Sequence, residues 1–87
     1  MFTVVFTKTS QKAYERLSSK IQKGVDRCVE YIRINPTHGP NIKKLKGDLS
    51  ECYRYQLGGW RILYQVDEEH GEVRVFQIRL RGDIYKK

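Results

Sequence analysis

Long apolar segments and cysteine motifs are both missing from this 87-residue sequence. The longest uninterrupted apolar run, Val4-Val5-Phe6, is far too short to span a membrane or to form the core of a signal peptide. The two cysteines, Cys28 and Cys52, lack the CxxC spacing and the partner histidines of a zinc site. We interpret them as small buried hydrophobic residues, with a disulfide or a zinc site as the alternatives. These absences predict a cytoplasmic protein with no membrane partner.

Clusters of metal ligands are missing as well. No group of His, Asp and Glu residues has the spacing of a metal site, and neither His38 nor His70 has the neighbours of a catalytic triad. We therefore expect no metal and no other cofactor. Both histidines are expected to lie on the surface, in turns.

The charge of the chain is strongly unbalanced, because 17 Lys and Arg residues stand against 10 Asp and Glu residues. The net charge of +7 and the isoelectric point of about 9.6 favour a polyanionic partner. RNA, DNA and an acidic protein all satisfy that condition. Hydrophobic residues make up 39% of the sequence and charged residues 31%, as in a soluble globular protein. The length predicts one domain, residues 1–87, with a modest core.

A strand followed by two helices is predicted for the first part of the chain. Phe2 to Thr7 alternates between the two faces of a strand. Thr9 or Ser10 can be the N-cap of a short helix, and Ser18 or Ser19 the N-cap of a longer one. The apolar residues of the short helix are Ala13, Tyr14 and Leu17, and those of the longer helix, spaced with a helical period, are Ile21, Val25, Cys28, Val29 and Ile32.

Turn residues divide the rest of the chain. Asn35-Pro36 ends the longer helix, because proline disfavours helical backbone at the residue before it. A loop from Thr37 to Asp48 is expected next, followed by three strands, with a turn from Asp67 to Gly71 between the last two. The lysines of the loop are Lys43, Lys44 and Lys46, and the strands are Glu51–Leu57, Trp60–Asp67 and Glu72–Arg79. The order β-α-α-β-β-β predicts an α+β fold, with both helices packed on one face of a small, mainly antiparallel four-stranded sheet.

Gly58-Gly59 predicts a tight two-residue hairpin, with positive φ expected at both glycines. Counting outward from this turn gives each face of the hairpin. The bulky pairs Leu57–Trp60, Tyr55–Ile62 and Tyr53–Tyr64 share one face, and Arg54, Gln56, Arg61 and Leu63 share the other. The first face is expected to belong to the core and the second to be basic. Gln77 and Arg79 are assigned to the basic face.

This order of elements and three short motifs resemble the RelE/ParE superfamily, the toxins of bacterial type II toxin–antitoxin pairs. The motifs are Lys44-Leu45-Lys46-Gly47, Trp60-Arg61-Ile62-Leu63-Tyr64 and the segment from Ile78 to Tyr85. The resemblance covers essentially the whole chain. It is greatest to the RelE branch, whose members cut mRNA in the ribosomal A site. Members of the ParE branch share the fold but poison DNA gyrase.

The resemblance implies four catalytic residues, all basic or phenolic. Arg54 stands where the RelE branch has a strand lysine, and Arg61 matches its third-strand arginine. Arg81 matches the arginine after the last strand, and Tyr85 matches the C-terminal tyrosine. The sequence also departs from that branch, because Gln56 replaces a second lysine of the type member and Leu80 replaces a histidine found in some nuclease members.

Metal-free RNA cleavage uses the 2′-OH beside the scissile phosphate as the nucleophile. It requires a base for that hydroxyl, cations for the phosphorane and an acid for the 5′-oxygen. The three arginines can supply the cations, since their planar forks suit phosphate oxygens. Tyr85 is the expected base, because neighbouring arginines would favour its phenolate. Arg81 could donate a hydrogen bond to the leaving oxygen, and the sequence identifies no general acid.

The expected function is that of a toxin which cleaves mRNA on the ribosome and so inhibits translation. The residues expected to contact RNA or the ribosome are Lys43, Lys44, Lys46, Gln56 and Arg79. A cognate antitoxin is implied, which would cover the basic face with a helix or an added strand, and operator DNA would be reached only through that complex. Three alternatives stay open: a ParE-like gyrase inhibitor without nuclease activity, an RNase toxin that needs no ribosome, and an inactive relative.

Overall fold

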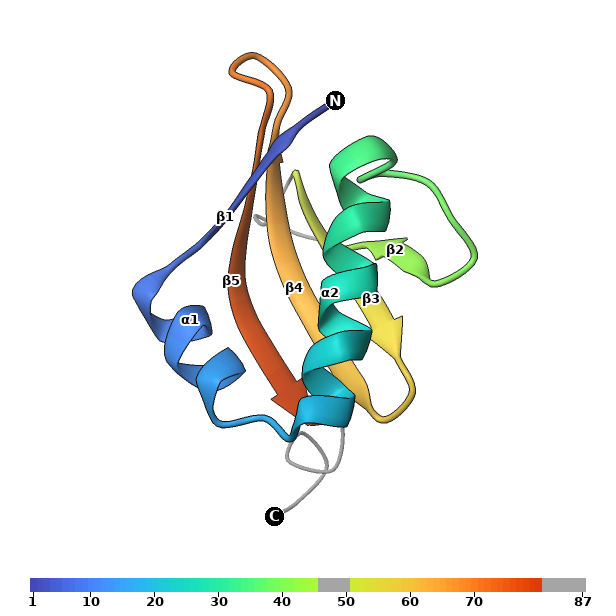
Figure 1. The fold of residues 1–87 in the computed structure, drawn as a ribbon. Helices are drawn as coiled ribbons and strands as arrows, with labels where there is room; N and C mark the ends of the chain where they lie inside the picture. The colour runs from blue at the N-terminus through green and yellow to red at the C-terminus, as the bar shows by residue number, and fades with distance from the viewer. Residues whose placement is uncertain (46–50, 81–87) are drawn as a thin grey trace.

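The computed structural model describes residues 1–45 and 51–80 of the chain. Its elements, in chain order, are β1 (Thr3–Phe6), α1 (Lys8–Glu15), α2 (Ser19–Ile34), β2 (Ile42–Lys44), β3 (Cys52–Leu57), β4 (Trp60–Asp67) and β5 (Glu72–Leu80) (Figure 1). Each of the four predicted strands begins and ends within one residue of its expected bounds.

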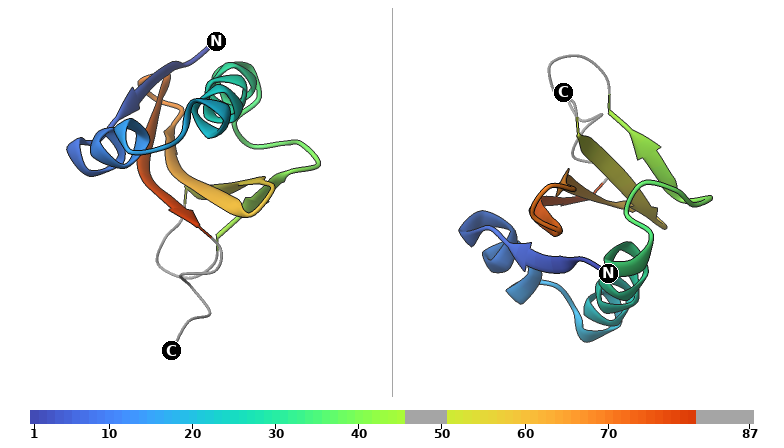
Figure 2. Two further views of the ribbon diagram at one scale, coloured as in Figure 1. Left: turned by 60° about the horizontal axis from the view of Figure 1, so that its bottom comes forward. Right: turned by 90° about the horizontal axis from the view of Figure 1, so that it is seen from above.

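The strands form one sheet in the order β1-β5-β4-β3-β2. The pair β1–β5 is parallel, and the other pairs of the described sheet are antiparallel. Both helices lie on the same side of this sheet (Figure 2), which confirms the α+β fold and the mainly antiparallel sheet.

The sheet of the described residues has five strands where the sequence predicted four. The extra strand, β2, lies inside the segment from Thr37 to Asp48 that was expected to be a loop, so that expectation is wrong in part. Residues 42–44 are extended because they pair with residues 53–55 of β3. That pairing joins positions about ten residues apart, and no local pattern in the lysine-rich segment indicates it.

α1 begins two or three residues earlier than predicted. Its N-cap is Thr7, whose Oγ accepts a hydrogen bond from the Ser10 amide at 3.2 Å, so the assignment of Thr9 or Ser10 is wrong. Ser10 is fully buried instead, and its Oγ donates to the Val75 carbonyl at 2.7 Å. The hydroxyl thus ties α1 to β5, which is why a small polar residue is found inside the fold.

α2 confirms the helical period of the sequence. Ser18 is its N-cap, and it ends at Ile34, before Asn35-Pro36. Its buried face includes Val25, Cys28 and Ile32, each at most 1% exposed. Both cysteines are buried and free, as the sequence predicted. Burial raises the pKa of the Cys28 thiol to about 12, so this thiol stays protonated and acts as a hydrophobic side chain.

Tyr64 of β4 lies at the centre of the core. Its ring stacks on Tyr53 at a centroid distance of 5.9 Å, and its hydroxyl donates to the Pro36 carbonyl at 2.6 Å. Burial raises the pKa of Tyr64, so its hydroxyl remains a donor. This bond fixes the chain where it leaves α2. The other core side chains are Val25, Cys28, Ile32, Ile62, Val66, Val73, Val75 and Ile78.

The β3–β4 hairpin has the predicted register, with Leu57 opposite Trp60 and Gln56 opposite Arg61. The expected positive φ at both glycines is wrong, because only Gly58 (57°) has it at this turn. One positive φ at the first turn residue is what a type II′ hairpin requires. The turn therefore needs one glycine, not two.

Candidate functional site

Two rows of residues cross the face of the sheet that lies away from the helices, which we call the outer face. One row is Lys43, Arg54, Leu63 and Gln77, and the other is Gln56, Arg61 and Arg79. Arg54, Arg61 and Arg79 thus come together from three strands, and we call them the arginine cluster. The predicted shared face of Arg54, Gln56, Arg61 and Arg79 is confirmed.

A β-bulge makes this arrangement possible. β4 and β5 pair Leu63 with Gln77 and then Tyr64 with Val75, which leaves Phe76 without a partner on β4. Without the extra residue, strict alternation from Val75 would turn Gln77 and Arg79 toward the core. The bulge switches the faces, so that Arg79 lies opposite Arg61.

The arginine cluster is partly sheltered from water. Arg54 and Arg61 are half-buried, whereas Arg79 is exposed. Within residues 1–45 and 51–80, no acidic side chain forms an ion pair with Lys43, Arg54 or Arg79. The Nε–H of Arg54 is buried and has no acceptor among those residues. A buried donor without an acceptor is costly, and an anion on the outer face would relieve that cost.

The side-chain amide of Gln56 forms hydrogen bonds within the hairpin. Its Nε2 donates to the carbonyls of Gly58 (2.6 Å) and Trp60 (3.3 Å), so the amide group holds the hairpin turn next to Arg61. Both protons of the amide nitrogen have acceptors. A contact from Gln56 to RNA would therefore use its carbonyl oxygen.

Two of the three lysines predicted to contact RNA, Lys43 and Lys44, lie on opposite faces of β2. Lys43 pairs with Arg54 and so joins the arginine cluster on the outer face. Lys44 pairs with Tyr53, which places it on the opposite face of β2, where it is exposed. Lys46 lies outside the described residues.

The two C-terminal catalytic residues implied by the resemblance, Arg81 and Tyr85, lie outside the described residues. β5 ends at Leu80, which pairs with Trp60 at the start of β4. The strand therefore ends at the same edge of the sheet as the Gly58-Gly59 turn. We call this edge, with the arginine cluster, the hairpin end.

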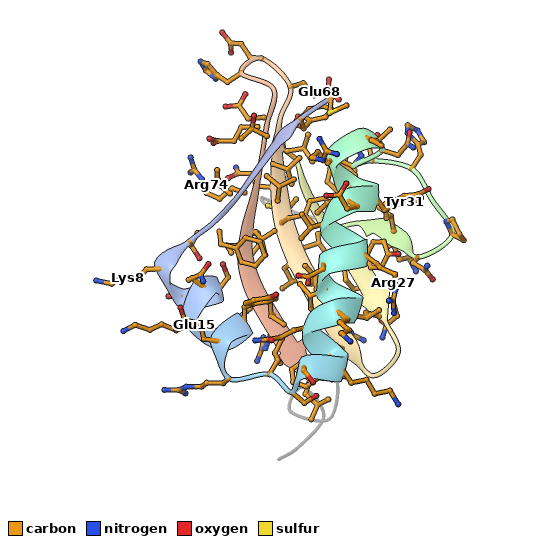
Figure 3. The ribbon with its side chains drawn as sticks, in the orientation of Figure 1. Lys8, Glu15, Arg27, Tyr31, Glu68 and Arg74 are labelled. Carbon is orange, nitrogen blue, oxygen red and sulfur yellow. The ribbon has the colours of Figure 1, made fainter. Side chains whose placement is uncertain are left out.

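The opposite edge of the sheet, at the β4–β5 turn, is acidic. A surface cavity of about 520 Å³ there is lined by Glu51, Gln65, Val66, Asp67, Glu68, Glu69, Glu72 and Arg74. Figure 3 shows Glu68 near this turn and Arg74 beside β5. Arg74 pairs with Glu72 at 2.9 Å, and the hydrogen bond from His70 lowers the pKa of Asp67. We call this edge the acidic end.

Neither a metal site nor a membrane span is found in the described parts of the chain. No group of three or more His, Cys, Asp and Glu residues there could hold a metal ion. Neither described helix is long and apolar enough to cross a bilayer. His38 and His70 are exposed, as expected.

Comparison with known proteins gives consistent matches over nearly the whole chain. A family model described as "ParE toxin of type II toxin-antitoxin system, parDE" matches residues 2–85. Two toxins of Mycobacterium tuberculosis are each 28% identical to this chain. Toxin RelG matches over 99% of this chain and 98% of its own length, and toxin RelE over 98% and 87%.

Solved structures show the same fold. The archaeal RelE–RelB complex from Pyrococcus horikoshii OT3 contains a chain with a TM-score of 0.81 and 21% identity, covering 93% of this chain and 96% of that one. The isolated E. coli RelE toxin has a TM-score of 0.81 and 24% identity, with coverage of 92% and 84%. The intact E. coli RelBE toxin–antitoxin complex gives 0.79 and 25%, with coverage of 90% and 94%.

Proposed function

The chain belongs to the ParE toxin family of type II toxin–antitoxin systems, within the RelE/ParE superfamily, and on this premise we propose that it is an mRNA-cleaving toxin of the RelE type. It would act in the cytoplasm, cut mRNA in the ribosomal A site and so stop translation. The arginine cluster is the observation that carries this proposal. Three guanidinium groups from three strands share one face, and among the described residues neither Arg54 nor Arg79 has an acidic partner.

In the proposed mechanism, the arginine cluster and the C-terminal residues have different roles. Arg54 and Arg61 would hold the scissile phosphate, since their half-buried guanidinium groups bind phosphate oxygens more strongly than exposed ones. Tyr85 would take the proton of the 2′-OH, and Arg81 would stabilise the charge of the leaving 5′-oxygen. Lys43 and Arg79 would contact neighbouring phosphates of the mRNA or rRNA. Lys44 and Lys46 remain candidates for rRNA contacts outside the cluster.

A cognate antitoxin is the proposed protein partner. Several solved structures with this fold are toxin–antitoxin complexes, among them the RelE–RelB and RelBE complexes. An antitoxin that covers the arginine cluster would block the access of RNA. Operator DNA would be bound by the antitoxin in that complex.

A second candidate function is inhibition of DNA gyrase without nuclease activity. It is favoured by the family model, whose description names the ParE toxin and parDE. Gln56 and Leu80, which replace a lysine and a histidine of the nuclease members, are compatible with it.

One set of assays separates the candidates. The purified toxin is incubated with programmed ribosomes, with the same mRNA free in solution, and with gyrase and relaxed plasmid. We expect cleavage of mRNA on ribosomes, little cleavage of free mRNA and normal supercoiling. Tyr85→Phe should lower the cleavage rate by about 10²–10⁴-fold, because it removes the proposed base. Inhibited supercoiling with intact mRNA would assign the chain to the gyrase inhibitors.

The matched control for Tyr85→Phe is Tyr14→Phe. The Tyr14 hydroxyl donates to Asp26 of α2 at 2.7 Å, on the helical side of the molecule. Tyr14→Phe should therefore cleave like the parent protein. Parental cleavage by Tyr85→Phe would remove Tyr85 from the role of base.

A further inference from the structure

An apolar band crosses the outer face beside the arginine cluster. It consists of Phe76 on β5, Leu63 on β4 and Val5 on β1. Leu63 lies opposite Gln77, and Val5 lies opposite Arg74. All three side chains are partly exposed, and none of them is among the described residues that form the core or pack against it. The cluster thus borders an aromatic and aliphatic surface.

The β-bulge is what puts Phe76 in this band. The residue follows Val75, which faces the core, so alternation turns Phe76 outward. The next residue, Gln77, also faces outward because the bulge sets two residues of β5 against one of β4. Bulges commonly redirect side chains next to functional sites.

The distance between strands indicates how far the Phe76 ring lies from the arginine cluster. Leu63 lies on the strand next to that of Phe76, which corresponds to about 5 Å at the usual distance between strands. Arg54 lies two strands from Phe76, which corresponds to about 10 Å. A flat apolar group and an anionic group on one ligand could therefore bind side by side. Single-stranded RNA has this pair in every nucleotide, a base and a phosphate.

We propose that Phe76, supported by Leu63, stacks against a base of the RNA whose phosphates contact Arg54 and Arg61. The proposal rests on the proposed function and adds a base-binding residue to it. Bases stack on aromatic rings whatever their sequence, so Phe76 would strengthen binding without selecting a codon. Arg54 and Arg79, which have no acidic partner among the described residues, favour a polyanion over a purely apolar occupant beside the band.

The test compares three variants on programmed ribosomes that carry a fluorescent adenine analogue in the codon exposed in the A site. Phe76→Leu removes the ring and keeps an apolar side chain, and Phe76→Tyr keeps the ring. Phe6→Leu is the matched control. Phe6 lies opposite Val75 on β1, but its ring packs against the core and lies 6.0 Å from the ring of Tyr14.

For Phe76→Leu we expect KM for the ribosome complex to rise about 5- to 150-fold, the range that loss of one stacked base gives. The quenching of the fluorescent base should be lost, and the salt dependence should stay unchanged because no phosphate contact is removed. Phe76→Tyr should keep both the KM and the quenching of the parent. Phe6→Leu should lower Tm and leave KM and quenching unchanged.

Parental KM and quenching in Phe76→Leu would overturn this proposal alone, if the parent cleaves mRNA. A parental KM together with weakened antitoxin binding would show that the band is a protein-docking surface instead. If the parent neither cleaves mRNA nor quenches the fluorescent base, both this proposal and the proposed function fail.

Discussion

The hairpin end and the acidic end of the outer face both carry arginine, but in opposite surroundings. At the acidic end, Arg74 is paired with Glu72 and borders a cavity lined by five acidic side chains. At the hairpin end, Arg54 and Arg79 lie near Arg61 with no acidic partner among the described residues. The net charge of +7 is thus unevenly distributed. The proposed anion site is therefore at the hairpin end, where Arg54 and Arg79 have no acidic partner among the described residues.

The sharpest test of this difference replaces one arginine at each end. Arg61→Ala should lower ribosome-dependent cleavage by about 10²–10³-fold, because it removes a donor to the charge that develops in the transition state. Arg74→Ala, on the same face, should cleave like the parent because Arg74 is already paired with Glu72. Single-turnover rates at saturating ribosome measure the effect. Equal losses in both variants would mean that the two ends do not differ in function.

The two turns give a second comparison. Gly58 at the hairpin end has φ of 57° and Gly71 at the acidic end has φ of 63°, and both have open space where a Cβ would lie. Gly58→Val and Gly71→Val should each destabilise the fold by about 1–3 kcal/mol, because β-branched residues resist positive φ. Only Gly58→Val should also slow cleavage, by up to about 10²-fold, since Gln56 and Arg61 depend on that turn.

Gly59→Ala is the control for that pair. Its φ is not in the left-handed region, and a Cβ there would make ordinary contact with Leu80 at 3.9 Å. Its Tm and cleavage rate should match those of the parent. If Gly58→Val melts like the parent, the hairpin turn does not need its glycine.

A smaller effect is expected from the neighbouring lysines of β2. Lys43→Ala should reduce the salt slope of RNA binding by about 0.7, the value for one lost contact to a single strand. Lys44→Ala should leave the slope unchanged if the outer face binds the RNA, because Lys44 lies on the other face of the strand. Titration at several salt concentrations gives both slopes. A reduced slope in Lys44→Ala alone would place the RNA elsewhere.

The smallest effect concerns the acidic end. The hydrogen bond from His70 lowers the pKa of Asp67 below its ordinary value of about 3.9. A lowered pKa contributes stability that is present above this ordinary value and lost as the pH falls through the folded-state pKa. Asp67→Asn should therefore lower Tm slightly at pH 7, and the difference should disappear in acid. Cleavage at pH 7 should not change, and a clear loss would connect the acidic end to the activity.

Local patterns predicted much of the fold and part of the site. The helical period of α2, its cap at Ser18 or Ser19 (Ser18 in the structure) and the register of the β3–β4 hairpin were all correct. Each depends on residues close together in the chain, where spacing alone fixes which side chains share a face. The common face of Arg54 and Arg61 follows from that register. The functions of these residues stay predictions.

Other features depended on contacts that spacing does not reveal. Ser10 matched the pattern of an N-cap, but the structure uses it to bind the Val75 carbonyl. The segment around Lys43 looked like a loop, but it pairs with β3. Gln56 was expected to contact RNA, which stays a prediction, but the structure adds that its amide nitrogen holds the hairpin turn. In each case, a partner elsewhere in the fold set the role of the residue.

The sequence by itself determined the α+β fold, the hairpin and the excess of positive charge, because these follow from composition and from local periods of 2 and 3.6 residues. It also assigned Arg54, Arg61 and Arg79 to one face, and only the tertiary structure shows how Arg79 comes to lie there. Val73 and Val75 have the same parity in the sequence as Gln77 and Arg79, yet the bulge at Phe76 places the two pairs on opposite faces. Such a bulge is set by the pairing of β5 with β4 as the core forms, so alternation along a single strand cannot reveal it.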